Sequence, residues 1–148
     1  MRDLTLERNL RLLILLMDSW KKLHDFITYA LDRAKPIISA DQERQFTEVR
    51  ATLLQEAEHI FTELNLVPDL SGKTMNVLQR AVSLRGVREL TGEDTRRLEA
   101  DWNFVFTKLG LLQGQLKARR KALFGRSALG VALARLLGRG VEARTGSR

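Results

Sequence analysis

The sequence predicts an all-α protein, in which three long helices and one short helix form an antiparallel helical bundle that is followed by a basic, amphipathic C-terminal extension. Three observations support this prediction. Apolar residues recur at alternating steps of three and four, as on a buried helix face. The composition is rich in Leu, Arg, Glu and Ala, with two prolines and one tyrosine in 148 residues, which favours helix. Positive charge is concentrated at the C-terminal end.

The first helix is predicted from about Thr5 to Lys35. Its seam consists of Leu6, Leu10, Leu13, Met17, Trp20, His24, Ile27, Leu31 and Ala34. A neighbouring stripe of Leu12, Leu16, Leu23, Phe26 and Ala30 widens the apolar face, as is typical of a helix inside a bundle. Pro36 disfavours helical geometry in the residue before it and ends the segment. The broad seam either closes within the chain or is completed by a homodimer.

The second helix is predicted to begin after Ser39, because Ser39 and Gln42 have the spacing of a capping box. Its apolar stripe consists of Phe46, Val49, Leu53, Ala57, Ile60 and Leu64, and it closes between Asn65 and Pro68. A turn through residues 69–72 then leads to a short helix that starts near Lys73. The apolar face of this short helix is predicted to consist of Met75, Leu78 and Val82, and Gly86 is expected to fray or kink it.

The last long helix is predicted to begin at Thr91, which is a suitable N-cap before the acids of the first turn. Its seam consists of Leu98, Trp102, Val105, Leu109, Leu112 and Leu116. Gly110 and Gly114 are one turn apart, and we expect them to mark a tight crossing with the short helix or a bulky side chain.

No catalytic, metal-binding or cofactor-binding residue is assigned, so the chain is expected not to be an enzyme. Cysteine is absent, which excludes disulfides, thiolate ligands and thiol nucleophiles. Glu56 and His59 have the spacing of a di-iron ligand pair, but the only other histidine, His24, has Lys21 three residues before it. A metal-binding bundle is therefore a remote alternative. The segment from Ser71 to Thr74 lacks the upstream glycine of a phosphate-binding loop.

Several arginines cluster around the turn before the last long helix and interleave with acids. The arginines are Arg80, Arg85, Arg88, Arg96 and Arg97, and the acids are Glu89, Glu93, Asp94 and Glu99. We expect a solvated, salt-bridged corner, with a second anion-binding patch as the alternative.

The charge distribution predicts two regions, a bundle domain at 1–116 and a basic tail at 117–148 whose end is expected to be disordered. The whole chain carries a net charge of +7. Residues 115–148 contain nine basic residues and one acid, Glu142, whereas residues 1–114 contain 16 basic and 17 acidic residues. A nearly neutral body with a cationic end indicates a scaffold that presents an anion-binding segment.

If residues 124–138 are helical, the spacing places Leu129, Leu133 and Leu136 along one side. A basic amphipathic helix of this kind is typical of segments that dock on an anionic membrane surface or in a groove of a partner protein. The residues assigned to this binding surface are Lys117, Arg119, Arg120, Lys121, Arg126, Leu129, Leu133, Arg135, Leu136 and Arg139. In a competing interpretation, residues 123–137 fold back as a last bundle helix.

The leucines of the tail favour a membrane surface or a protein groove over nucleic acid. An arm that only binds phosphates does not need these leucines, and the tail has neither Tyr nor Trp to stack on bases. Nucleic acid remains the alternative partner. No segment has the length and apolarity of a membrane span. The sequence therefore predicts a cytoplasmic protein that is peripheral to the membrane and needs no cofactor.

Overall fold

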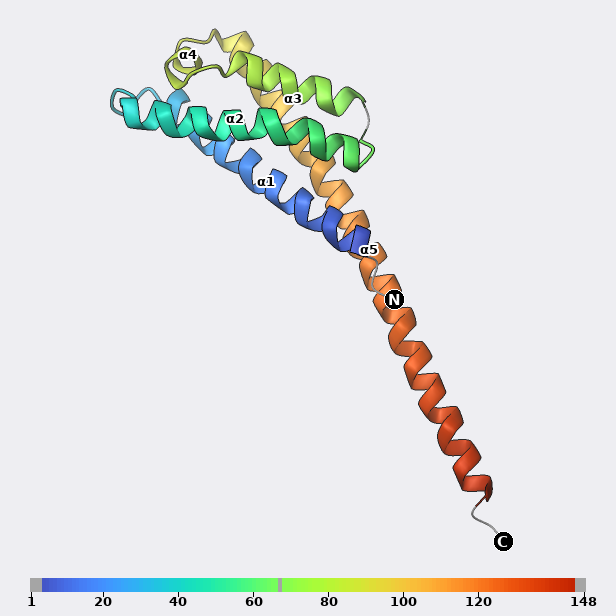
Figure 1. Cartoon of the computed structure of the whole chain (residues 1–148). Helices are drawn as coiled ribbons and strands as arrows, with labels where there is room; N and C mark the ends of the chain where they lie inside the picture. Colours follow the sequence, from blue (N-terminus) through green and yellow to red (C-terminus); the bar gives the residue numbers. More distant parts are fainter. Residues whose placement is uncertain (1–3, 67, 146–148) are drawn as a thin grey trace. The chain divides into compact units, whose positions relative to one another are not determined.

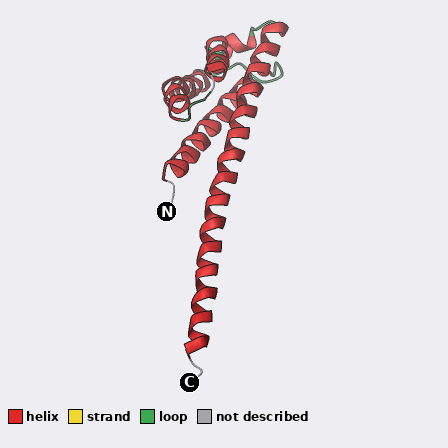
Figure 2. Ribbon diagram, turned by 90° about the vertical axis from the view of Figure 1, so that its right-hand side faces the viewer, coloured by secondary structure: helices red, strands yellow, loops and turns green. Residues whose placement is uncertain are grey.

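The protein is all-helical in the computed structural model, which describes residues 4–66 and 68–145, without the side chains of 68–69, 126–134 and 137–145. It contains helices α1 (Leu4–Leu31), α2 (Ala40–Glu63), α3 (Pro68–Arg80), α4 (Leu84–Arg88) and α5 (Gly92–Thr145), with no strand in the part described (Figure 1). Short loops join the helices (Figure 2). Residue contacts divide the chain into two units, Met1–Gln113 and Gly114–Arg148.

The seam of α1 lies in the core of the first unit. The buried residues of this helix are Leu6, Leu10, Leu13, Leu16, Met17, Trp20, Leu23, Ile27 and Ala30. They come from both predicted stripes, while His24 and Leu31 of the seam and Leu12 and Phe26 of the neighbouring stripe are half-buried. These residues therefore pack within the first unit.

The prediction that α1 extends to Lys35 is wrong, because the helix ends at Leu31. A carboxylate oxygen of Asp32 accepts a hydrogen bond from the backbone N–H of Ala34 at 3.0 Å. This local bond, together with the restriction that Pro36 imposes, favours a turn over another helical turn. Ala34, predicted as part of the seam, is consequently exposed.

The capping box of α2 is confirmed. The hydroxyl oxygen of Ser39 accepts from the backbone N–H of Gln42 at 3.1 Å, and the Gln42 side chain accepts from the Ser39 N–H at 2.8 Å. The buried face of α2 contains Phe46, Leu53, Ala57, Ile60 and Phe61. Just after the helix, Asn65 has a φ of 51°. Asparagine tolerates this left-handed conformation better than most residues, which is consistent with a chain reversal at this point.

The predicted turn at 69–72 and the predicted start near Lys73 are wrong, since α3 already begins at Pro68. Proline fits the first turn of a helix, where its missing N–H costs no hydrogen bond. The buried face of α3 consists of Leu70, Thr74, Val77 and Leu78, and Ala81 follows it. Met75 and Val82, predicted to be buried, are 39% and 60% exposed.

A break at 81–83 separates α3 from α4, so Gly86 lies inside a distinct short helix instead of fraying the preceding one. Ser83 caps α4, and its hydroxyl accepts from the Gly86 N–H at 3.0 Å. A Cβ atom at Gly86 would lie 2.9 Å from that hydroxyl oxygen. Glycine is therefore the residue that lets Ser83 approach closely enough to cap.

The start of α5 agrees with the predicted cap. The hydroxyl oxygen of Thr91 accepts from the backbone N–H of Asp94 at 3.2 Å and donates to the Asp94 carboxylate at 3.0 Å. The buried seam residues are Leu98, Trp102, Val105 and Leu109, with Leu112 and Leu116 half-buried. The helix continues through residues 117–145, and residues 146–148 lie outside the described part. Among the described helices, none has an apolar stretch long enough to cross a bilayer.

The tight crossing predicted at Gly110 and Gly114 is wrong. No heavy atom lies within 4 Å of a Cβ atom built at either position, apart from their chain neighbours and the backbone of their own helix. The two glycines therefore have no steric role in the described structure, and each carries the entropic cost of glycine in a helix interior.

We predict that Gly110→Ala raises the free energy of unfolding by about 0.5–1 kcal/mol, because alanine restricts the unfolded chain and fits the space. Denaturant unfolding measures the change. Gly86→Ala is the matched control and is expected to destabilise, since its methyl group collides with the Ser83 cap. A loss of stability in Gly110→Ala would contradict the open environment.

Candidate functional site

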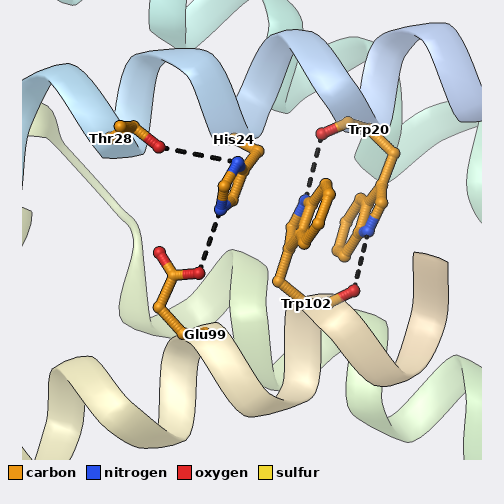
Figure 3. A network of polar contacts seen from close by, with 5 residues as sticks. All are labelled: Trp20, His24, Thr28, Glu99 and Trp102. Atoms are coloured by element: carbon orange, nitrogen blue, oxygen red, sulfur yellow. Dashed lines mark hydrogen bonds and ion pairs between the residues drawn. The ribbon is translucent and has the colours of Figure 1, made fainter. Parts of the chain in front are cut away.

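Among the described residues, functional side chains gather at four places: an aromatic and polar cluster between α1 and α5, an ion-pair cluster between α3 and α5, the arginine-rich corner, and a cationic segment in the second unit. In the first cluster, Trp20 and Trp102 exchange hydrogen bonds (Figure 3). The indole N–H of Trp20 donates to the backbone oxygen of Trp102 at 3.2 Å, and that of Trp102 donates to the backbone oxygen of Trp20 at 3.1 Å. Both side chains were predicted to be buried, and they are 1% and 7% exposed.

His24 extends this cluster towards the surface. Its ring stacks on Trp102, with centroids 4.0 Å apart, and Phe106 stacks on Trp102 at 5.0 Å. The Nε2 atom of His24 lies 2.9 Å from Oε2 of Glu99. His24 is thus a half-buried core histidine with a partner, as the seam position predicts.

A hydroxyl, an imidazole and a carboxylate follow one another here, because Thr28 Oγ1 lies 3.5 Å from Nδ1 of His24 (Figure 3). The order resembles a catalytic triad, but the distance is at the limit of a hydrogen bond. Thr28, His24 and Glu99 all lie inside helices, where backbone N–H groups bond within the helix. The described part of the cluster therefore offers no free pair of amides to stabilise an oxyanion. Its geometry suits a clamp between α1 and α5.

A second polar cluster joins α3 to α5. The carboxylate of Asp101, whose side chain is 13% exposed, forms ion pairs with Arg80 at 2.9 Å and with Lys73 at 3.3 Å. Lys73 also lies 5.8 Å from the ring centroid of Phe104. Lys73 belongs to the segment from Ser71 to Thr74, which was compared above with a phosphate-binding loop. In the structure this segment lies within α3, and the ammonium group of Lys73 forms an ion pair with Asp101 of α5.

The arginine-rich corner uses much of its charge internally. The guanidinium of Arg88 donates to the backbone oxygens of Ala30, Pro36 and Asp32 at 2.8, 3.1 and 3.4 Å. Arg97 pairs with Glu93 at 2.6 Å. Within the described residues, the pair of Arg97 with Glu93 is the one ion pair between these arginines and the acids named with them, so the expected salt-bridged corner is supported only in part. The binding of Arg88 to the end of α1 was not predicted.

Glu43 is a further residue that sequence reasoning missed. Its carboxylate accepts from the backbone N–H groups of Leu84 and Arg85, at 3.0 and 2.8 Å. It therefore holds the N-terminus of α4, where the helix dipole favours a negative charge. Nothing in the local sequence connects Glu43 with residues some forty positions away.

The Glu56 and His59 pair lies on the exposed side of α2. Within the described residues, no group of three or more His, Cys, Asp or Glu side chains converges as metal ligands do.

In the second unit, Lys117, Arg119, Arg120, Lys121 and Arg135 are all exposed. None of them forms an ion pair with any described residue. Leu136 is 67% exposed. The side chains of the other predicted binding residues, Arg126, Leu129, Leu133 and Arg139, lie outside those that the structure describes.

Two apolar residues of this segment were not selected from the sequence. Leu123 is 44% exposed and Phe124 is 77% exposed, directly after the basic run. Their position directly after Lys121 is the feature of the sequence that could have identified them as part of this segment. The segment therefore combines unpaired cations with exposed apolar side chains on a single helix.

No protein-family model matches the chain, and comparison with curated proteins and with solved structures finds no significant match.

Proposed function

We propose that residues 1–113 form an antiparallel helical bundle with no catalytic role, and that residues 114–148 dock this bundle on an anionic membrane surface. One observation carries the proposal: four of the five residues from Lys117 to Lys121 are exposed cations without an acidic partner among the described residues. A helix with so many unpaired like charges is stabilised by an external anion, because neighbouring like charges repel. On this proposal the protein is cytoplasmic and peripheral to the membrane.

The magnitudes favour a membrane. Near an anionic leaflet each basic residue contributes about 1 kcal/mol, and full burial of a Leu or Phe side chain contributes about 1.5–3 kcal/mol. The segment offers both terms, since Leu136 is 67% exposed on the same helix as the cations. A phosphate-binding arm for nucleic acid would use only the first term.

We predict that replacing Lys117, Arg119, Arg120 and Lys121 with glutamine weakens binding to vesicles that contain phosphatidylserine. Four contributions of about 1 kcal/mol each correspond to a loss of up to about 10³-fold in affinity. Flotation of the full chain with vesicles, at low and high salt, measures the change. Binding of the intact chain should fall at high salt, because salt screens exposed charges.

The control variant replaces Arg11, Lys22, Arg33 and Lys35 with glutamine. These residues are exposed in the first unit, so the variant loses the same net charge elsewhere. It should float almost as the intact chain does. Equal losses in both variants would show that net charge alone drives binding and would contradict the assigned segment. Binding to duplex DNA without flotation would favour the nucleic-acid alternative, and failure to bind either would favour a protein groove.

A further inference from the structure

The second unit has one helix side without charge. In the described part this charge-free face consists of Ala118, Ala122, Gly125 and Leu136, and Leu136 is 67% exposed. With 3.6 residues per turn, each residue advances about 100° around the axis, so the four positions lie within about 60° of one another. Leu129 and Leu133 have the spacing of the same side, although the structure does not describe their side chains.

Cations border this face on both sides. By the same geometry, Lys121 lies about 65° from the centre of the charge-free face in one direction, and Arg119 lies about 95° away in the other. Both are exposed and lack an acidic partner in the described structure. Their long aliphatic stems allow the charged groups to reach a polar layer while the helix itself lies deeper.

The two most exposed apolar residues near the basic run lie elsewhere. Leu123 and Phe124 are about 125–135° from the centre of the charge-free face. Arg120 lies close to Phe124 on the opposite side of the helix, and it is exposed. The side with Phe124 therefore carries charge, whereas the face with Ala122 does not.

We infer that the helix of the second unit lies in the plane of an anionic membrane with its charge-free face towards the acyl chains. This inference rests on the proposed function and adds the orientation of the bound helix. An interfacial helix buries an uncharged sector and keeps its cations at the rims, where they meet anionic headgroups. Arg119 and Lys121 occupy those rims, and Phe124 faces away from the bilayer.

The cations that border the charge-free face also disfavour the packing of a second copy of this chain against it. Two such faces packed against each other would bring the rims of both copies together, and each rim is cationic. Like charges across a helix pair repel, whereas phosphatidylserine headgroups supply the complementary sign.

The chain contains no cysteine, so single cysteines can carry an environment-sensitive fluorophore without background labelling. We would label the full chain at Ala118, Ala122 or Leu136 on the charge-free face, and at Leu123 or Phe124 away from it. All five positions are exposed, so labelling should leave the fold intact. The probe membrane is phosphatidylcholine with phosphatidylserine, and phosphatidylcholine alone is the neutral control.

Labels on the charge-free face should shift to the blue on binding and become severalfold less accessible to acrylamide, while labels at Leu123 and Phe124 stay accessible. Two of the labels on the charge-free face replace alanine, which is less apolar than leucine or phenylalanine. Protection of these labels would therefore show that the position on the helix, and not the polarity of the replaced side chain, determines contact with the membrane. Protection at Leu123 and Phe124 instead, or equal protection all round, would overturn the orientation and leave the proposed function standing. Flotation without any change in the labels would do the same. Absence of flotation would overturn both.

Discussion

Trp102→Ala is expected to lower the free energy of unfolding of the first unit by about 3–5 kcal/mol. The indole is 7% exposed and stacks on both His24 and Phe106. Its removal leaves a cavity and deletes the hydrogen bond from its N–H to the backbone oxygen of Trp20. Since domains are stable by only about 5–15 kcal/mol in total, the loss would be a large share. Denaturant unfolding followed by circular dichroism measures it.

Two further variants separate packing from hydrogen bonding. Trp102→Phe keeps an aromatic ring but lacks the N–H group. Its free energy of unfolding should therefore lie between that of the intact chain and that of Trp102→Ala. Phe104→Ala is the matched control, because Phe104 is two residues away and 38% exposed. Its loss should be clearly smaller. If Trp102→Ala cost no more than Phe104→Ala, the arrangement between α1 and α5 would be wrong.

Trp20→Ala tests the same contact from the other helix. The two tryptophans share hydrogen bonds and a parallel ring arrangement, with centroids 6.1 Å apart and planes 2° apart. The stability changes caused by substitutions at residues that share partners do not simply add. The double variant should therefore lose less stability than the sum of the two single variants.

The parts of the fold that follow from local chemistry were predicted from the sequence. The seam of α1 and the capping box of Ser39 and Gln42 depend on spacing within one helix, and both agree with the structure. The cap of Thr91 is equally local. Such features need only residues that are neighbours in the chain, which is why a periodic pattern identifies them.

The parts that failed depend on competition between local signals or on contacts far apart in sequence. Pro68 was interpreted as closing α2, but proline is equally suited to the first turn of a helix, and here it opens α3. The buried face of α3 also contains Leu70 and Val77, whereas Met75 is 39% exposed. The partner of His24, Glu99, lies 75 positions away, and no spacing rule connects the two.

The candidate membrane site shows a similar division. Charge counting alone selected the cations from Lys117 to Lys121, and the structure places all four on the surface. The exposure of Phe124 was not predicted, because an apolar residue in a helical sequence is usually assigned to a core. The structure shows that its side chain is 77% exposed.

Arg88→Met is expected to destabilise the first unit by about 2–3 kcal/mol. The guanidinium donates to three backbone oxygens at and beyond the C-terminal end of α1, at 2.8, 3.1 and 3.4 Å. Hydrogen bonds from charged donors are the stronger kind, and α1 has no basic residue in its last turn to offset its dipole. Because Arg88 is half-buried, the expected loss is well below the sum of three such bonds. Denaturant unfolding measures it.

Arg88→Lys distinguishes charge from geometry. A lysine keeps the positive charge near the helix end but cannot match a planar group whose donors spread over three oxygens, so about half of the loss should remain. Arg85→Met is the control: its guanidinium reaches one oxygen, that of Ile38, at 3.5 Å, so its removal should change stability little. Full stability in Arg88→Lys would mean that charge near the dipole suffices. Full stability in Arg88→Met would mean that water replaces the guanidinium at the end of α1, and α4 would then be held by Glu43 and its apolar contacts alone.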